Sequence, residues 1–320
     1  LRVANQKQID VRVVEAVVPD AENKLQIVYH NSMPQSIDYR TKLIKQAWEK
    51  STLLNEEKEK VSKSFYEKRR NNILTQDSFV YTLGQKKGVL PDGWDSNKRN
   101  WVVFNSSEDE FTSLGPDWDS LALFPSQLEG VEFIAKQLLV DDDSVVYVRI
   151  HPNLKGNTNS YHLGLYELEK KHSNLTIIPA DSNISTYTLM DEMYAGVAFG
   201  SSAGIEAAAS NKPVVLLAGC YYYHLDATYN PKSEEELSTV LLDMSLQPKP
   251  QKGSILYGYY MSDPKVLAEP FKYQVKKSKG LFRWDIPHLR VWGSKFLYRI
   301  AVIYTRRVYS FINGRRLDLS

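Results

Sequence analysis

Short apolar runs alternate with helical patterns along the middle of the chain, from Trp101 to Ser245. Runs rich in β-branched residues indicate buried strands, and apolar positions three and four residues apart indicate amphipathic helices. The predicted strands are 101–104, 145–150, 175–178, 195–199 and 214–217. The predicted helices are 127–139, 160–172, 186–193, 205–210 and 233–245. This alternation predicts an α/β fold, with a Rossmann-like parallel sheet covered by helices.

The residues on either side of this region follow other patterns. Apolar runs at 9–18 and 25–29 predict two strands, and one long helical pattern rich in Lys and Glu covers 37–71. The polar stretch 84–100 contains Gly and Pro and is typical of a connection. Near the C-terminus, 291–312 places aromatic and aliphatic residues at helical spacing. We therefore predict three parts, 1–96 with the long helix, an α/β domain over 97–270, and a helical extension over 271–320.

The composition is that of an ordinary globular protein, with 42% hydrophobic and 24% charged residues among 320. The single cysteine, Cys220, excludes an internal disulfide and fits a reducing compartment. We find no signal peptide and no uncharged apolar span of about 18 residues, so we expect a cytoplasmic protein. The first residue is Leu1, and the run 9–18 resembles a core strand without a preceding unit. We therefore expect that an N-terminal part is missing.

The net charge of +2 conceals an uneven distribution. Residues 271–320 contain twelve Lys or Arg and two Asp, a balance of +10, which leaves −8 for residues 1–270. Tyr and Trp interleaved with Arg on an amphipathic helix are typical of a membrane interface. The stretch 291–312 therefore predicts peripheral binding at the inner face of the plasma membrane; a helix that packs back on the protein is the alternative. No recognition motif accompanies these charges, so no nucleic-acid partner is expected.

A turn without bulky side chains follows the strand 195–199 and opens the next helix. Its sequence is Gly200-Ser201-Ser202-Ala203-Gly204. Hydroxyls and backbone N–H groups at a helix N-terminus bind phosphate. Glu206 follows one turn later, where a carboxylate can accept hydrogen bonds from a ribose. The turn therefore indicates a nucleotide-linked ligand, unless its small residues serve only the tight packing of strand and helix.

A second cluster follows the strand 145–150 and consists of Arg149, His151, Pro152 and Asn153. Ligands of open parallel sheets bind beyond the carboxyl ends of the strands, so this cluster and the 200–204 turn are expected at one crevice. His151 can give a hydrogen bond or a proton to a leaving phosphate, and Arg149 adds positive charge. Pro152 presents an apolar face to a base. A structural role in the turn is the alternative for the histidine.

Four segments in this order resemble a known family. They are FNSSEDEF (104–111), VRIHPN (148–153), IPADSNISTYTLMD (178–191) and FGSSAGIEAAASNKPVVLLAG (199–219). Together they are similar to the glycosyltransferases of bacterial capsule and lipopolysaccharide biosynthesis, which have the two-domain GT-B architecture. The His-Pro pair followed by a Ser-Ser turn is also similar to bacterial sialyltransferases and Kdo transferases, which use CMP-activated sugars. The resemblance implies that 97–270 is the donor domain and that 1–96 is a remnant or part of the acceptor-side domain.

The resemblance also implies roles at the crevice. His151 would meet the donor phosphate together with Ser201 and Ser202, and Pro152 would meet the base. Asp181 and Tyr187, which follow the strand 175–178, would line the same crevice. The implied reaction is a metal-independent transfer of a hexosyl or of a Kdo or sialyl group. No cofactor is expected besides the nucleotide-sugar substrate, and this donor is CMP-linked if the group is Kdo or sialyl. The implied acceptor is a lipid-linked or polymeric glycan.

Residues 1–100 show no convincing copy of the acidic general-base motif that sialyltransferase-like enzymes carry. The catalytic base is therefore expected either in a missing N-terminal segment or, within this chain, in the loop after the strand 101–104. Glu108 and Asp109 are the candidates to deprotonate an acceptor hydroxyl. Ser106 and Ser107 are candidates to bind phosphate or sugar oxygens. An acidic run after serine is also typical of a helix N-cap. A sugar-nucleotide 2-epimerase, or a non-catalytic nucleotide- or glycan-binding module of a polysaccharide assembly complex, stays as an alternative.

Overall fold

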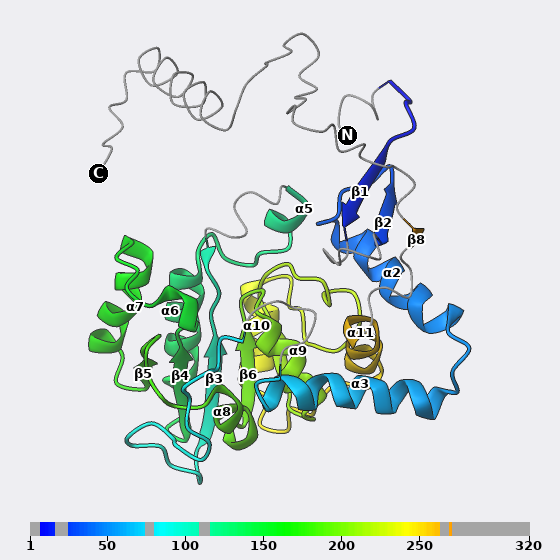
Figure 1. Cartoon of the computed structure of the whole chain (residues 1–320). Coiled ribbons are helices and arrows are strands. Elements are labelled where there is room, and N and C mark those ends of the chain that lie inside the picture. Colours follow the sequence, from blue (N-terminus) through cyan, green and yellow to red (C-terminus); the bar gives the residue numbers. More distant parts are fainter. Residues whose placement is uncertain (1–6, 17–24, 74–79, 109–115, 263–268, 271–320) are drawn as a thin grey trace, which may run out of the picture. The chain divides into compact units, whose positions relative to one another are not determined.

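The computed structural model describes residues 7–16, 25–73, 80–108, 116–262 and 269–270 (Figure 1). All of the described residues belong to one compact unit, Leu1–Pro270. The amphipathic helix predicted over 291–312 lies outside the described residues. Within the described ranges, the helices are too short or too polar to cross a bilayer.

A five-stranded parallel sheet lies at the centre of the first unit, in the order β5-β4-β3-β6-β7. The strands are β3 (Arg99–Phe104), β4 (Ser144–Arg149), β5 (Leu175–Ile178), β6 (Ala195–Ala198) and β7 (Val214–Leu216). The chain runs outward from β3 through β4 to β5, and then returns to pair β6 with the other side of β3. The predicted α/β fold with a Rossmann-type sheet is confirmed. Its switch point lies between β3 and β6, the place where such sheets bind ligands.

The predicted helices that connect the strands are α6 (Gln127–Leu138), α7 (Ser160–Lys171), α8 (Thr186–Glu192) and α9 (Ser202–Ala209), and the predicted α10 (Glu234–Leu241) follows β7. A further short helix, α5 (Pro116–Asp119), precedes α6. Several begin at a serine whose hydroxyl accepts a backbone N–H bond, namely Ser126, Ser185, Ser201 and Ser233. These caps are local signals, and the predicted helices 127–139, 186–193 and 233–245 begin at or next to them, whereas α9 begins at Ser202, three residues before the predicted start at 205.

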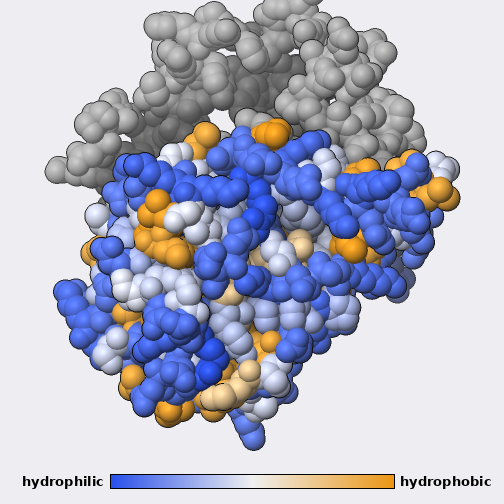
Figure 2. All heavy atoms as spheres, turned by 90° about the horizontal axis from the view of Figure 1, so that it is seen from below, coloured by the Kyte–Doolittle hydropathy of each residue, from blue (hydrophilic) through white to orange (hydrophobic). Residues whose placement is uncertain are grey.

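The alternation of side chains along β3 builds two cores, one on each face of the sheet. Trp101 and Val103 belong to a core with α6, α7 and α10. Val102 and Phe104 belong to a core with residues of α8, α9 and the N-terminal helices. On the face shown in Figure 2, hydrophilic residues predominate and hydrophobic residues occur in small separate groups. The buried apolar side chains of the described residues are thus divided between these two cores.

The N-terminal residues form a small antiparallel sheet and two helices. The sheet has the order β1-β2-β8, with β1 (Arg12–Ala16), β2 (Leu25–His30) and β8 (Glu269–Pro270). The single long helix predicted over 37–71 is wrong, because the structure has α2 (Ile37–Lys50) and α3 (Asn55–Arg70). Ser51 ends α2 in an extended conformation. The backbone N–H of Leu54 then donates to the Glu57 carboxylate at 2.8 Å and starts α3.

The helix α11 (Lys252–Ser262) holds α3 against the rest of the unit (Figure 1). A Cβ atom at Gly258 would lie 2.4 Å from the Ser62 hydroxyl oxygen, so the two helices approach closely only because this residue is glycine. The Tyr66 hydroxyl donates to the Ser254 carbonyl oxygen at 2.7 Å. The C-terminal end of α3 lies near α8 and α9 in Figure 1. An N-terminal helix therefore reaches the edge of the parallel sheet.

Candidate functional site

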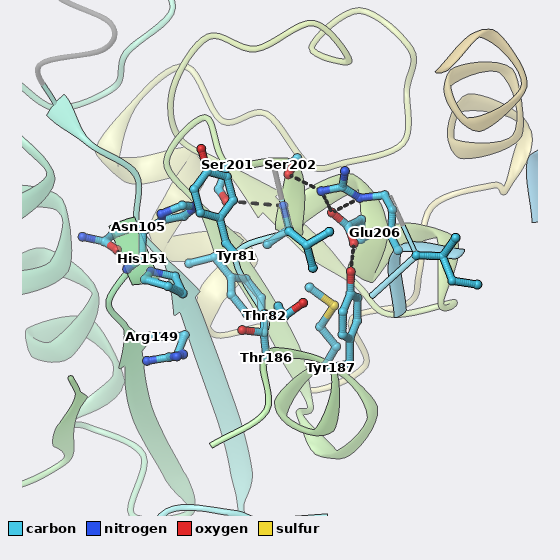
Figure 3. Close-up of a pocket in the computed structure, with 17 residues that line it drawn as sticks. Tyr81, Thr82, Asn105, Arg149, His151, Thr186, Tyr187, Ser201, Ser202 and Glu206 are labelled. Atoms are coloured by element: carbon cyan, nitrogen blue, oxygen red, sulfur yellow. Dashed lines mark hydrogen bonds and ion pairs between the residues drawn. The ribbon is translucent and has the colours of Figure 1, made fainter. Parts of the chain in front are cut away.

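The loops after β3, β4 and β6 meet at a pocket beside the switch point of the sheet (Figure 3). Arg149 and His151 lie on one side of the pocket, and Tyr187 and Glu206 lie on the other. The structure thus brings together most of the residues predicted for one crevice, namely Arg149, His151, Pro152, Tyr187, Ser201, Ser202 and Glu206. The cavity volume is about 80 Å³, well below the ~300–1,000 Å³ of pockets for drug-sized ligands.

The turn after β6 has the backbone of an anion site. Gly200 has φ +73°, a left-handed conformation that favours glycine. The Ser201 hydroxyl accepts the backbone N–H of Ala203 at 3.3 Å and caps α9. Beneath the turn, the buried Tyr222 hydroxyl donates to the Ser201 carbonyl oxygen at 2.6 Å. Gly204 does not line the pocket but packs against this tyrosine, where a Cβ atom would lie 2.4 Å from the hydroxyl oxygen.

His151 is fixed by the neighbouring loop. Its backbone N–H donates to the side-chain oxygen of the buried Asn105 at 2.7 Å, which ties the loop after β4 to the loop after β3. Its ring Nδ1 contacts the side-chain oxygen of Asn153, and its ring edge meets Tyr81 with the centroids 4.8 Å apart. Pro152 begins the short helix η1 (Pro152–Leu154). Asn153 therefore orients the imidazole and does not itself line the pocket.

Arg149 is a buried cation, with 2% of its surface exposed. Its guanidinium donates to the carbonyl oxygens of Pro179 and Ser182, the second at 3.3 Å. Its Nε has no hydrogen-bond partner among the described residues. Burial lowers the pKa of Arg149 to about 10, against the opposing charge of Asp181. A buried guanidinium beside a pocket, bonded to carbonyls, is suited to an anionic ligand.

The carboxylate of Glu206, predicted to face a ribose, is buried and already bonded. One oxygen, Oε1, accepts hydrogen bonds from Arg69 of α3, from Nε at 3.0 Å and from Nη2 at 2.9 Å. The other, Oε2, accepts the Tyr187 hydroxyl at 2.7 Å. Burial, together with the charge of Glu206, raises the pKa of Tyr187. Arg69 was not among the predicted site residues, because its place depends on the packing of α3 against a distant part of the chain.

The remaining predicted residues that the structure describes do not line the pocket. The Ser106 hydroxyl donates to the Phe199 carbonyl oxygen at 2.5 Å, and Ser107 is buried in the same loop. The Glu108 carboxylate accepts the backbone N–H of Gln127, the first residue of α6, at 2.6 Å. Asp109 lies outside the described residues. Of two other predicted residues, Gly200 precedes the pocket-lining Ser201 in the turn, and the charge of Asp181 acts on Arg149.

Neither a family model nor a curated protein sequence matches this chain. Among solved structures it is similar to KpsC of Thermosulfurimonas dismutans. The β-Kdo 2,4-transferase of KpsC is 14% identical, with a TM-score of 0.49 over 81% of this chain and 74% of that chain. The β-Kdo 2,7-transferase is 12% identical, with a TM-score of 0.42 over 80% and 72%.

A putative UDP-N-acetylglucosamine 2-epimerase from Listeria monocytogenes is also similar. It is 12% identical, with a TM-score of 0.36 over 55% of this chain and 47% of that chain. This chain thus spans about half the length of the epimerase. Likenesses of this degree do not establish membership of a family.

Proposed function

We propose that the protein is a glycosyltransferase of GT-B type that transfers a sugar from a nucleotide donor to a capsule or lipopolysaccharide glycan. The pocket at the switch point carries this proposal. There Arg149, His151 and the Ser201-Ser202 turn at the N-terminus of α9 surround one small volume. A guanidinium, an imidazole, hydroxyls and a helix N-terminus all bind phosphate. The volume of about 80 Å³ suits a phosphate group, so the sugar and nucleoside would extend beyond it, past Tyr81.

In the proposed reaction, an acceptor hydroxyl oxygen forms a bond to the anomeric carbon while the bond from that carbon to the donor phosphate oxygen breaks. The acceptor proton passes to a base. The negative charge that develops on the departing phosphate is stabilised by Arg149, the two serines and the N-terminus of α9. His151 gives a hydrogen bond or a proton to the phosphate. No step of this scheme is routed through a metal.

The proposed identity of the donor nucleotide and the proposed location of the acceptor rest on the sequence. The His-Pro pair at 151–152 and the Ser-Ser turn support a CMP-linked donor. The basic stretch 291–312 supports an acceptor at a membrane surface, because a lipid-linked glycan is presented there. Both are proposed together with the transferase activity.

A nucleotide panel tests the proposed function. CMP, CDP, UDP, GDP and ADP are titrated calorimetrically into the wild type, His151→Ala and, as a matched control, His224→Ala, whose exposed ring lies outside the pocket. We expect one nucleotide to bind, with an affinity that falls in His151→Ala and not in the control. CMP would support a Kdo- or sialyl-type donor, and UDP or GDP a hexosyl donor. Absence of binding by all five would refute the proposal.

A non-catalytic nucleotide-binding module is the second candidate, and the placement of the carboxylates favours it. Among the described residues that line the pocket, Glu206 supplies the carboxylate, and Arg69 and Tyr187 occupy both of its oxygens. Glu108 caps α6. Release of the nucleotide from an activated sugar distinguishes the candidates, because a binding module would hold the donor without cleaving it.

A further inference from the structure

Arg69 and Ser202 lie together at the N-terminus of α9. The Nη2 atom of Arg69 is 3.4 Å from the Ser202 hydroxyl oxygen and 2.9 Å from Oε1 of Glu206 (Figure 3). A phosphate that accepted hydrogen bonds from the α9 N-terminus and Ser202 would therefore lie within reach of this guanidinium. Arg69 also lines the pocket and is bonded to Glu206, which lies on the side opposite Arg149 in Figure 3.

Resting on the proposed function, we propose that Arg69 binds the donor phosphate and that Glu206 positions Arg69 instead of binding the ribose. The carboxylate is suited to this role because its two oxygens are bonded on different sides. Oε1 accepts both Nε and Nη2 of Arg69, while Oε2 accepts the Tyr187 hydroxyl at 2.7 Å. A ribose hydroxyl would have to compete with the ion pair of the buried Glu206 carboxylate and with the half-buried Tyr187 phenol. A charged hydrogen bond of this kind is stronger than a neutral one.

The end of α3 is itself held in place, so Arg69 is fixed before a ligand arrives. The neighbouring Arg70 donates to both oxygens of Asp191, at 2.7 and 3.0 Å, and to the Ser210 hydroxyl at 2.9 Å. These contacts join α3 to α8 and α9. Preorganised donors lose less entropy when a ligand binds.

The charges around the pocket fit one phosphate group. The charged side chains among the described residues that line it are Arg69, Arg149 and Glu206, which sum to +1. A sugar joined to a nucleoside through one phosphodiester carries one negative charge on that group, whereas a diphosphate carries two. The net charge of the lining therefore matches the single negative charge of one phosphodiester group.

The test compares ligands with and without phosphate, and with and without the ribose 2′-hydroxyl. CMP, cytidine, 2′-deoxy-CMP and inorganic phosphate are titrated into the wild type, Arg69→Gln, Glu206→Gln and Lys68→Gln. Lys68 is the matched control, an exposed cation next to Arg69 that does not line the pocket. Thermal unfolding of each variant, with Arg69→Lys as a milder change, verifies that the protein is folded.

We expect Arg69→Gln to weaken CMP binding roughly 10- to 100-fold, as the loss of a charged hydrogen bond does, with cytidine binding unchanged. Glu206→Gln should also weaken CMP binding, but the ratio of the affinities for CMP and 2′-deoxy-CMP should stay the same. In the double variant, Glu206→Gln should lower the CMP affinity little further than Arg69→Gln does alone. If Glu206→Gln loses cytidine binding, or changes the ratio of the CMP and 2′-deoxy-CMP affinities, Glu206 binds the ribose and the inference is wrong.

The two proposals can fail separately. If the wild type binds CMP and Arg69→Gln binds it equally well, the Arg69 inference is wrong and the proposed function stands. If the wild type binds inorganic phosphate in an Arg69-dependent manner but none of the five nucleotides, the phosphate site stands and the proposed function is wrong.

Discussion

Replacing Gly204 with alanine tests whether Tyr222 supports the phosphate-binding turn. Gly204 lies within α9, where alanine is favoured over glycine by about 1 kcal/mol. However, an added Cβ atom would lie 2.4 Å from the Tyr222 hydroxyl oxygen and 2.8 Å from the Ala198 Cβ. Overpacking of this kind costs about 1–3 kcal/mol. The clash should therefore outweigh the helical preference, and we expect Gly204→Ala to lower the free energy of unfolding by up to about 2 kcal/mol.

The assay is urea unfolding of the wild type, Gly204→Ala, Tyr222→Phe and the double variant. Tyr222→Phe removes the hydroxyl that donates to Ser201 at 2.6 Å, which should cost about 0.5–1.5 kcal/mol. In the double variant the closest clash is absent. Its loss in free energy of unfolding should therefore be smaller than the sum of the losses in the two single variants. Nucleotide affinity should fall in both single variants, because each displaces the turn. A more stable Gly204→Ala protein with unchanged nucleotide affinity would refute this account of the turn.

Three further predictions concern other parts of the unit. Asn105→Ala should lower the free energy of unfolding by about 1–3 kcal/mol in urea, because the His151 N–H loses its acceptor, whereas an unchanged value would contradict this. Arg149→Met should weaken nucleotide binding at least about tenfold by calorimetry, since a charged hydrogen bond is lost; equal affinity would exclude a phosphate contact. Burial lowers the pKa of His162, so the unfolded chain binds a proton that the folded chain does not, and stability should fall as the pH drops below about 6.5. His162→Leu should flatten the dependence of Tm on pH in that range, and an unaltered slope would contradict the assignment.

The parallel sheet and its helices were predictable because their signals are local. Each strand is an apolar run, and caps such as Ser126 and Ser233 mark helix starts. The carboxyl ends of neighbouring parallel strands necessarily share one edge. For that reason, His151 and Ser201 could be assigned to the same pocket without coordinates.

Features that depend on long-range packing could not be predicted. The helix α11 buries residues around most of its circumference, including Leu256, Tyr257 and Tyr260, so it lacks an amphipathic pattern, and it contains Gly253 and Gly258. The pairing of Glu206 with Arg69 joins residues 137 positions apart. The sequence therefore predicted that Glu206 lies at the site, but not which group it bonds.

The most direct test of the donor-site proposal is a crystal structure of the protein with the nucleotide that binds in the panel. We predict that its phosphate lies at the N-terminus of α9, within hydrogen-bond distance of Ser201 or Ser202 and beside Arg149 and His151. A nucleotide bound elsewhere on the protein, with this pocket unchanged, would contradict the central claim.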